Sequence, residues 1–249
     1  MTYCVGLRIS EGLVLLADTQ TNAGLDNVSR FAKMFTFENP GERVMALMTS
    51  GNLSITQGVV TRLRYGIKAA AQGPGRTTLL NAESMYQVAE LVGAEMKRMQ
   101  LENREAIERH GQSAEASILL AGQRRGGKHR LFLIYSAGNF IQATDDTPYF
   151  QLGEHKYGKP ILDRVIGPNS SLEESMKAVC VSMDSTIRSN LSVGMPLDLA
   201  VIEKDALTFR IHRRIERTDA RFSAISDSWA KALSQGFQEL PNLLEPEGP

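Results

Sequence analysis

The sequence has no excess of charge of either sign. It carries 28 basic and 28 acidic residues, so its formal net charge is zero. This balance gives no electrostatic basis for binding nucleic acid or an anionic membrane. Two short basic runs stand out, at 124–130 and 210–217. We interpret them as a hairpin tip and an exposed strand end, with a nucleic-acid patch as the alternative.

Cysteine is scarce, and long apolar runs are missing. Cys4 and Cys180 predict neither a disulfide framework nor a metal site, and the four histidines lack the spacing of metal ligands. No apolar stretch approaches the roughly 18 residues that span a bilayer, and the N-terminus lacks a charged-then-apolar signal sequence. We therefore expect a cytoplasmic protein with no metal or organic cofactor.

What the sequence does contain is an ordered series of strand and helix patterns. Strands dominate the first fifty residues, two helices follow, more strands occupy 116–152, and two further helices precede a hairpin and a final helix. Hairpins and paired helices predict an α+β fold, a four-layer αββα sandwich of two mainly antiparallel sheets. We expect residues 1–240 to form a single domain and 241–249 a flexible C-terminal tail.

The start of the chain carries the first chemical signal. Thr2 follows Met1 directly, and removal of the methionine would give this threonine a free α-amine close to its own hydroxyl. An α-amine has a reference pKa of about 7.7–8.0, so near neutral pH it can accept the hydroxyl proton. Thr2 is thus a possible nucleophile of the N-terminal kind, although many proteins begin with Met-Thr for no catalytic reason.

A lysine in an apolar segment carries the second signal. Lys33 lies within Phe-Ala-Lys-Met-Phe, which we expect to begin a strand over 33–37. A buried lysine needs a carboxylate partner, and Asp18, at the end of the strand 13–17, is the nearest candidate. The alternative is an edge strand from which Lys33 reaches solvent.

Taken together, these motifs resemble a known family. Thr2, Gly12 followed after five residues by Asp18, Thr21-x-Ala23-Gly24, Lys33 and Met48-Thr49-Ser50-Gly51 are similar to proteasome-type peptidases of the N-terminal-nucleophile hydrolase superfamily. Within it, the stretches Met-Thr-Tyr-Cys-Val, Ala-Asp-Thr-Gln-Thr-Asn-Ala-Gly and Leu-Gly-Glu-His-Lys-Tyr-Gly-Lys-Pro-Ile resemble the bacterial Anbu family. The resemblance extends over roughly residues 2–240.

The resemblance implies a role for each matching residue. Thr2 would be the nucleophile and, through its amine, the general base. Lys33 would favour the alkoxide as it forms, and Asp18 would keep Lys33 charged and oriented. The backbone N–H of Ser50 would stabilise the oxyanion, a contribution worth about 2.7–4 kcal/mol in other acyl-transfer enzymes.

Two positions depart from the family pattern. The usual Arg-Asp-x-x-Ser-Gly-Gly reads Arg-Ser-Asn-Leu-Ser-Val-Gly here, so Ser192 is kept and Ser189 replaces the aspartate. The serine that commonly follows a glycine after the middle strands is replaced by Glu154. We hypothesise that Glu154 partly compensates for the lost carboxylate. The alternatives are a surface Glu154 paired with Lys156 and serines that bond local backbone at a helix end.

The sequence therefore predicts a threonine-type endopeptidase that hydrolyses peptide bonds without a cofactor. The family implies a homo-oligomer, a ring or a helical assembly, and the charged end of the second helix is one expected contact surface. Two alternatives stay open. One is an amidase that acts on small molecules or isopeptides with the same nucleophile, and the other is a catalytically weak, self-assembling structural protein.

Overall fold

The computed structural model describes residues 2–22, 28–73, 75 and 77–242, and its centre is a pair of five-stranded antiparallel sheets. The first sheet holds the start of the chain in its interior. In spatial order it consists of β10 (Tyr149–Gly153), β1 (Tyr3–Ile9), β2 (Gly12–Asp18), β11 (Leu197–Glu203) and β12 (Ile211–Ile215).

The second sheet follows sequence order throughout, as expected for consecutive hairpins. Its strands are β5 (Met34–Asn39), β6 (Arg43–Gly51), β7 (Ala116–Arg124), β8 (Arg130–Ile134) and β9 (Phe140–Gln142). A two-stranded ribbon, β3 (Gln20–Asn22) and β4 (Val28–Arg30), connects the two sheets along the chain.

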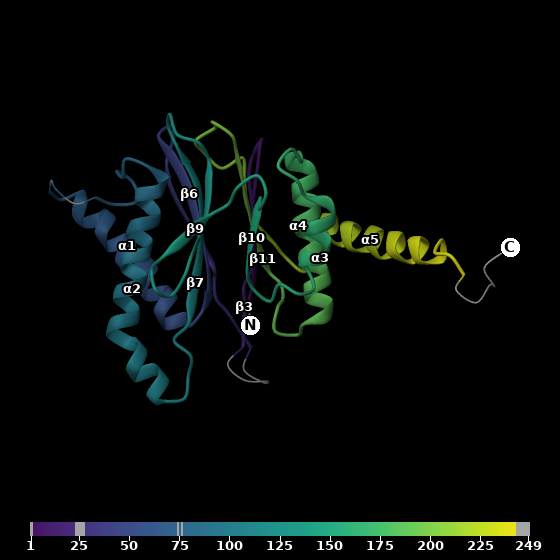
Figure 1. Cartoon of the computed structure of the whole chain (residues 1–249), viewed down its shortest axis with the longest axis horizontal. Coiled ribbons are helices and arrows are strands. Elements are labelled where there is room, and N and C mark those ends of the chain that lie inside the picture. Colours follow the sequence, from purple (N-terminus) through teal and green to yellow (C-terminus); the bar gives the residue numbers. More distant parts are fainter. Residues whose placement is uncertain (1, 23–27, 74, 76, 243–249) are drawn as a thin grey trace.

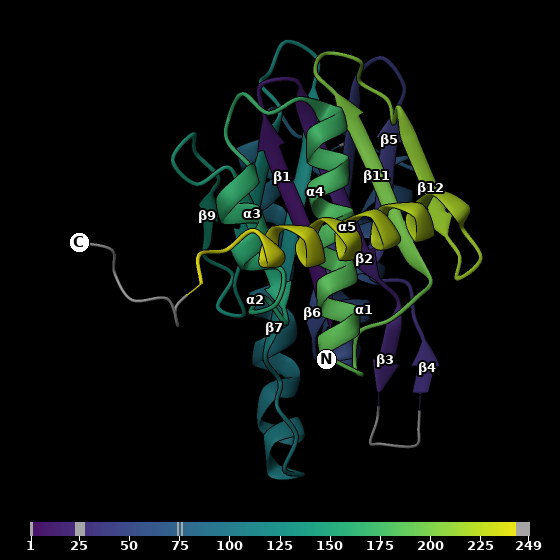
Figure 2. The same cartoon turned by 90° about the vertical axis from the view of Figure 1, so that its right-hand side faces the viewer.

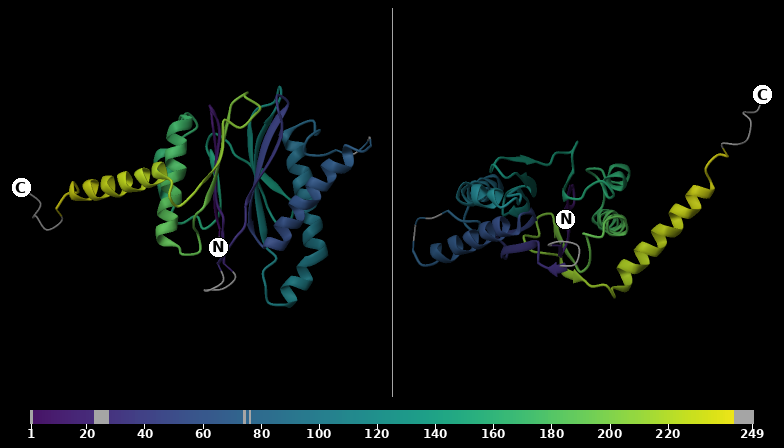
Figure 3. Two further views of the ribbon diagram at one scale, coloured as in Figure 1. Left: turned by 180° about the vertical axis from the view of Figure 1, so that it is seen from behind. Right: turned by 90° about the horizontal axis from the view of Figure 1, so that it is seen from below.

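Helices cover the outer face of each sheet, so four layers lie side by side (Figure 1). The first pair, α1 (Leu53–Ala70) and α2 (Met85–Arg109), covers the second sheet, and the second pair, α3 (Lys159–Val165) and α4 (Leu172–Ser189), covers the first. The predicted αββα sandwich is confirmed. The last helix, α5 (Ala220–Gln238), contacts α4 and then projects away from the sandwich (Figure 3).

Three apolar clusters hold the layers together, one at each junction. The cluster between the sheets includes Cys4, Leu15 and Met48, whereas Tyr3, Val5 and Leu16 of the same strands face α4. The strands β1 and β2 are therefore buried on both faces, which explains why their sequences are continuous apolar runs. Each fully buried Leu or Val contributes about 1.5–3 kcal/mol relative to an exposed one.

Helix starts follow capping chemistry. Asn52 caps α1, and Ser171 forms a capping box with Glu174 at α4, in agreement with the acidic first turn expected there. The second helix begins later than predicted: Ser84 rather than Asn81 is the N-cap of α2. Asn81 instead accepts the backbone N–H of Thr78 at 2.6 Å and closes the preceding turn.

Two expectations about strands need correction. The ribbon β3–β4 was not expected, because its polar residues show no apolar alternation. The residues at 207–209, expected in the last strand, do not form a strand: β12 begins only at Ile211, because the chain turns after Glu203, where Asp205 and Leu207 have φ values of 63° and 53°. Of the predicted tail, residues 243–249 lie outside the described part of the chain, as do residues 23–27 of the Thr21-x-Ala23-Gly24 region. No helix among the described residues is long and apolar enough to cross a membrane.

Candidate active site

Asp18, the last residue of β2, and Lys33, just before β5, are hydrogen-bonded to each other. The Lys33 ammonium donates to Asp18 Oδ1 and to the Gln20 carbonyl, both at 2.6 Å. Asp18 is fully buried and Lys33 is only 4% exposed. Lys33 directly precedes β5 instead of lying within it, so its predicted place on a strand is wrong by one residue. The alternative in which Lys33 reaches solvent is also wrong.

The electrostatics of this pair follow from its burial. Removal from water raises the pKa of the Asp18 carboxyl, and the Lys33 ammonium and the Tyr3 amide act in the opposite direction. An ion pair this deep gains little net stability, because desolvation of both ions offsets their attraction. The pair places the buried Lys33 ammonium beside the start of β1, where Asp18 also accepts the Tyr3 amide.

The backbone of Thr2 is fixed from two sides. Its carbonyl accepts the N–H of Glu154 at 2.7 Å, which extends the β1–β10 ladder by one residue. The next amide, of Tyr3, donates to Asp18 Oδ1 at 3.0 Å. The Asp18 oxygen that receives the Lys33 ammonium thus also receives the amide that follows Thr2. Thr2 itself is 9% exposed.

Gly153 allows β10 to approach this closely. It has a φ of +77°, and a Cβ placed on it would lie 1.9 Å from the Thr2 carbonyl oxygen. Only glycine adopts this conformation without strain and leaves room for the Thr2 carbonyl. The Leu-Gly-Glu motif therefore has a local structural reason: Gly153 brings the backbone of Glu154 against Thr2.

Tyr3 anchors the same segment through its side chain, and sequence reasoning did not identify it as a site residue. Its hydroxyl accepts from Gln151 Nε2 at 2.6 Å and lies 2.6 Å from Ser182 Oγ on α4. Burial raises the pKa of the Tyr3 hydroxyl to about 12, so it stays protonated and can donate to Ser182. No sequence signal identified Tyr3, because an apolar strand commonly contains an aromatic residue.

Glu154 is held by a neighbour that sequence reasoning also missed, Asn190. The Glu154 carboxylate accepts the backbone N–H of Lys156 at 3.1 Å and Asn190 Nδ2 at 3.2 Å. Asn190 Oδ1 in turn accepts the N–H of Ser192 at 2.9 Å. Glu154 is 9% exposed, so the alternative of a surface carboxylate in an ion pair with Lys156 is wrong. In the sequence, only its position between Ser189 and Ser192 indicates that Asn190 could lie near the site.

The two serines of this motif differ in their surroundings. Ser192 lies half-buried in the turn that Asn190 holds. Ser189 is the exposed last residue of α4, and within the described residues it makes no side-chain hydrogen bond to the predicted site. Arg188 turns away from the site toward Asp184 and Ser226. The structure thus brings Asn190, rather than Ser189, to Glu154.

Ser50 lies near the end of β6, one residue beyond a contact with Lys33. The Thr49 N–H donates to the Lys33 carbonyl at 3.0 Å, and the Thr49 carbonyl lies 3.9 Å from Cys4 Sγ. Gly51 follows with a φ of +98°, and a Cβ there would lie 2.2 Å from the Glu115 carbonyl. This glycine turns the chain sharply from β6 toward α1, which leaves Ser50 at the rim of the sandwich end.

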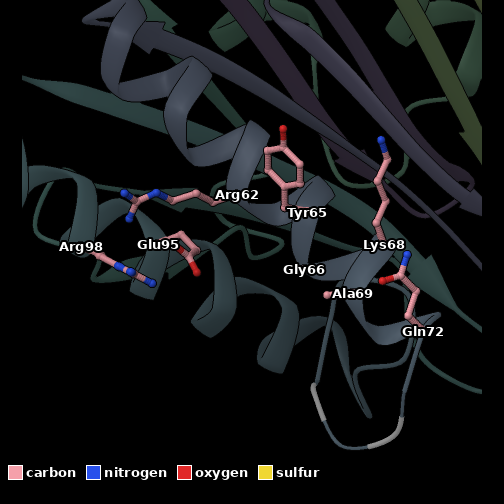
Figure 4. Close-up of a pocket in the computed structure, with 8 residues that line it drawn as sticks. All are labelled: Arg62, Tyr65, Gly66, Lys68, Ala69, Gln72, Glu95 and Arg98. Carbon is pink, nitrogen blue, oxygen red and sulfur yellow. The ribbon is translucent and has the colours of Figure 1, made fainter.

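No group of His, Cys, Asp and Glu side chains in the described ranges could hold a metal ion. A hollow of about 530 Å³ between α1 and α2 is lined by Arg62, Tyr65, Gly66, Lys68, Ala69, Gln72, Glu95 and Arg98 (Figure 4). None of these is a predicted site residue. Figure 2 places the start of the chain at the lower end of the sandwich, near the ribbon β3–β4.

Several solved structures are similar to this chain over nearly its whole length. Anbu from Yersinia bercovieri is 41% identical, with 98% of this chain and 100% of that chain covered at a TM-score of 0.90. Anbu from Hyphomicrobium sp. strain MC1 is 42% identical over 97% and 99% of the two chains, at a TM-score of 0.87. The helical assembly of the Anbu complex from Pseudomonas aeruginosa is 41% identical over 98% of each chain, at a TM-score of 0.90.

A more distant relative is the proteasome subunit beta of Haloferax volcanii. It is 22% identical over 216 residues, which cover 86% of this chain and 79% of that protein. No family model matches the chain. The structural matches span nearly the whole length of both partners at above 40% identity, and the chain therefore belongs to the Anbu family of ancestral proteasome β-subunit-like proteins.

Proposed function

We propose that this protein is a threonine peptidase that hydrolyses peptide bonds through Thr2 after removal of Met1. The observation that carries the proposal is the buried Lys33 ammonium, which shares Asp18 Oδ1 with the amide that follows Thr2. Burying the Lys33 ammonium costs desolvation energy. Its position beside the segment that carries Thr2 suits a role in stabilising the alkoxide that develops on Thr2.

In the first half of the reaction, Thr2 Oγ1 forms a bond to the carbonyl carbon of the substrate. The hydroxyl proton passes to the free α-amine of Thr2, which acts as general base. Lys33 lowers the energy of the negative oxygen as it forms, and Asp18 holds Lys33 in its charged state. When the tetrahedral intermediate collapses, the C–N bond breaks and the same proton leaves with the amine product.

The second half regenerates the enzyme. Water attacks the threonyl ester and gives a proton to the α-amine, and collapse of the second intermediate breaks the ester bond and returns the proton to Thr2 Oγ1. The backbone N–H of Ser50 donates to the oxyanion of both intermediates. Glu154, held by Asn190, orients the protonated amine, and Ser192 completes the polar surroundings. The exposed Ser189 contributes least.

Covalent labelling tests this proposal. The purified protein is incubated with a peptide epoxyketone, and its intact mass is measured. We expect N-terminal Thr2 and a mass gain of one inhibitor, both lost in Thr2→Ala. The matched control Thr208→Ala, an exposed threonine far along the chain, should label normally. Retention of Met1 or equal labelling of Thr2→Ala would contradict the proposal, and turnover of small amides but not peptides would favour the amidase alternative.

We also infer that the chain assembles with copies of itself, as the relative from Pseudomonas aeruginosa does in its helical assembly. The distal part of α5 presents two exposed apolar side chains, Leu233 and Phe237, whereas the charged end of α2 presents one, Leu101, among exposed ion pairs such as Arg104–Glu108. Apolar exposure favours α5 as the contact. Light scattering should report a smaller particle for Leu233→Ser/Phe237→Ser than for Leu101→Ser on α2, and an unchanged mass would exclude α5.

A further inference from the structure

The basic run at 124–130 forms the tip of the β7–β8 hairpin, as predicted, and several of its side chains gather at one place. At the end of the sandwich opposite Thr2, the β7–β8 hairpin meets the end of β1 and the turn between β11 and β12 around a hollow of about 650 Å³. The charged and imidazole residues that line it come from these segments and from the loop after β9: Arg8, Lys128, His129, Arg130, Asp145, Lys204 and Asp205. Lys128 and Arg130 also border a neighbouring hollow beside the start of α2.

The charges in this hollow do not balance. Arg8 forms an ion pair with Asp145. Asp205 accepts a hydrogen bond from the Gln123 amide and forms no ion pair in the ranges that the structure describes. Lys128, Arg130 and Lys204 form no ion pair within the described part of the chain. Four cations, Arg8 included, thus face two carboxylates in one concave site of a protein with zero net charge, which leaves a surplus of two positive charges there.

The walls of the hollow are held rigidly. Gln123 donates to Asp205 Oδ1 at 2.6 Å and to the Gly127 carbonyl at 2.8 Å, and it accepts the Asp205 N–H at 2.8 Å. One buried amide therefore ties the hairpin to the β11–β12 turn. His129, 8% exposed, lies 2.7 Å from the Ile9 carbonyl through Nε2 and ties the hairpin to β1. The backbone segments that carry the cations are therefore fixed before a ligand binds, so little backbone entropy would be lost on binding.

One donor beneath the wall of the hollow has no partner among the described residues. This donor is the buried Arg8 Nε, although a buried N–H without an acceptor costs about 1–3 kcal/mol. We propose that this hollow is a binding site for a compact, multiply charged oxyanion of the phosphate class, free or carried on a small molecule. Guanidinium and ammonium groups are the side chains that bind phosphate.

The shape of the site favours a compact anion over nucleic acid. A strand or duplex needs basic groups along an extended face, whereas these cations surround one hollow with the paired Asp145 at its edge. The volume is within the range of small-molecule pockets, about 300–1,000 Å³. The site also lies at the far end of β1 from Thr2, so its occupancy does not depend on the proposed peptidase chemistry.

Calorimetric titration with inorganic phosphate, and separately with glycerol phosphate, tests the proposal at constant ionic strength. We expect saturable binding with one site per chain, weakened about tenfold or more in Lys128→Gln/Lys204→Gln. The control Lys177→Gln/Lys231→Gln removes the same charge from exposed positions on α4 and α5 and should bind as the parent does. Binding of only one of the two ligands identifies whether the phosphate is free or esterified.

A substitution in the opposite direction separates the proposal from a loss of folding. Asp145→Asn removes the carboxylate that competes for Arg8, and Asp145 is largely exposed. We expect this variant to bind phosphate several-fold more tightly. No saturable heat with either ligand, equal weakening in the α4/α5 control, or succinate binding as tightly as phosphate would overturn the assignment. Because the readout is binding, an inactive Thr2 would leave this result unchanged.

Discussion

The two ends of the sandwich join the two sheets with different kinds of buried polar group. Each end joins strands of both sheets through buried polar side chains. At the Thr2 end the junction is an ion pair, Lys33 with Asp18. At the opposite end it is a neutral amide, Gln123, which donates to the Gly127 carbonyl and to Asp205 Oδ1 and accepts the Asp205 N–H. A neutral amide is enough to join the sheets at one end, which is consistent with the proposed catalytic role of the ion pair at the other.

The largest expected effect is at the ion pair. Lys33→Met leaves the Asp18 carboxylate buried without its cation, which costs about 3–5 kcal/mol of unfolding free energy. Peptide turnover should fall about 10²-fold or more, because the developing alkoxide loses its counter-ion. Urea unfolding and turnover of a fluorogenic peptide measure the two effects.

The double variant Lys33→Met/Asp18→Asn separates stability from chemistry. With both charges removed, most of the lost unfolding free energy should return while turnover stays at background. Turnover that recovers with stability would mean that the pair serves the fold alone, and the contrast between the two ends would disappear.

The next effect is at the opposite end. Gln123→Leu leaves the Asp205 N–H and the Gly127 carbonyl without partners, and we expect a loss of about 1–3 kcal/mol of unfolding free energy. Labelling of Thr2 by the epoxyketone should stay at the parent level, because the two ends share no polar contact. A fully stable variant would show that Gln123 does not hold this end together, and a folded variant that loses labelling would show that the two ends are not independent.

A smaller effect is expected at Glu154. Glu154→Gln keeps the shape of the side chain and the backbone contact to Thr2 but removes the charge that faces Asn190. Turnover should fall several-fold and the lower limb of its pH profile should move, because the protonated Thr2 amine loses a carboxylate neighbour. Asn190→Ala should shift the profile in the same direction. Unchanged turnover in Glu154→Gln would remove Glu154 from the mechanism.

Much of this arrangement was predictable from local patterns. The apolar runs of β1 and β2 placed Thr2 and Asp18 on one hairpin, and the anomaly of Lys33 in an apolar segment identified its partner. Tyr3, Gln123 and Asn190 were not predictable, because their partners are distant in sequence: Ser182, Asp205 and Glu154. Such contacts depend on how the sheets and helices stack, and a one-dimensional pattern does not contain that information.

The smallest effect concerns His129 and depends on pH. Burial lowers the pKa of its imidazole below 6.5, Arg8 and Lys204 lower it further, and the Ile9 carbonyl and Asp205 oppose them. Lys128 and Arg130 flank it on the hairpin and Asp145 lies at the edge of the hollow. Below pH 6.5 the unfolded chain binds a proton that the folded chain does not, so unfolding free energy falls as pH drops from 6.5 toward the lower folded pKa.

His129→Gln should remove this dependence, since the amide can still donate to the Ile9 carbonyl but does not titrate. Urea unfolding at pH 7.5 and 5.5 should therefore show the parent losing more stability than the variant on acidification. His110→Gln, at the exposed end of α2, should follow the parent. Parallel losses in the parent and His129→Gln would mean that another group, and not the His129 imidazole, causes the loss of stability at low pH.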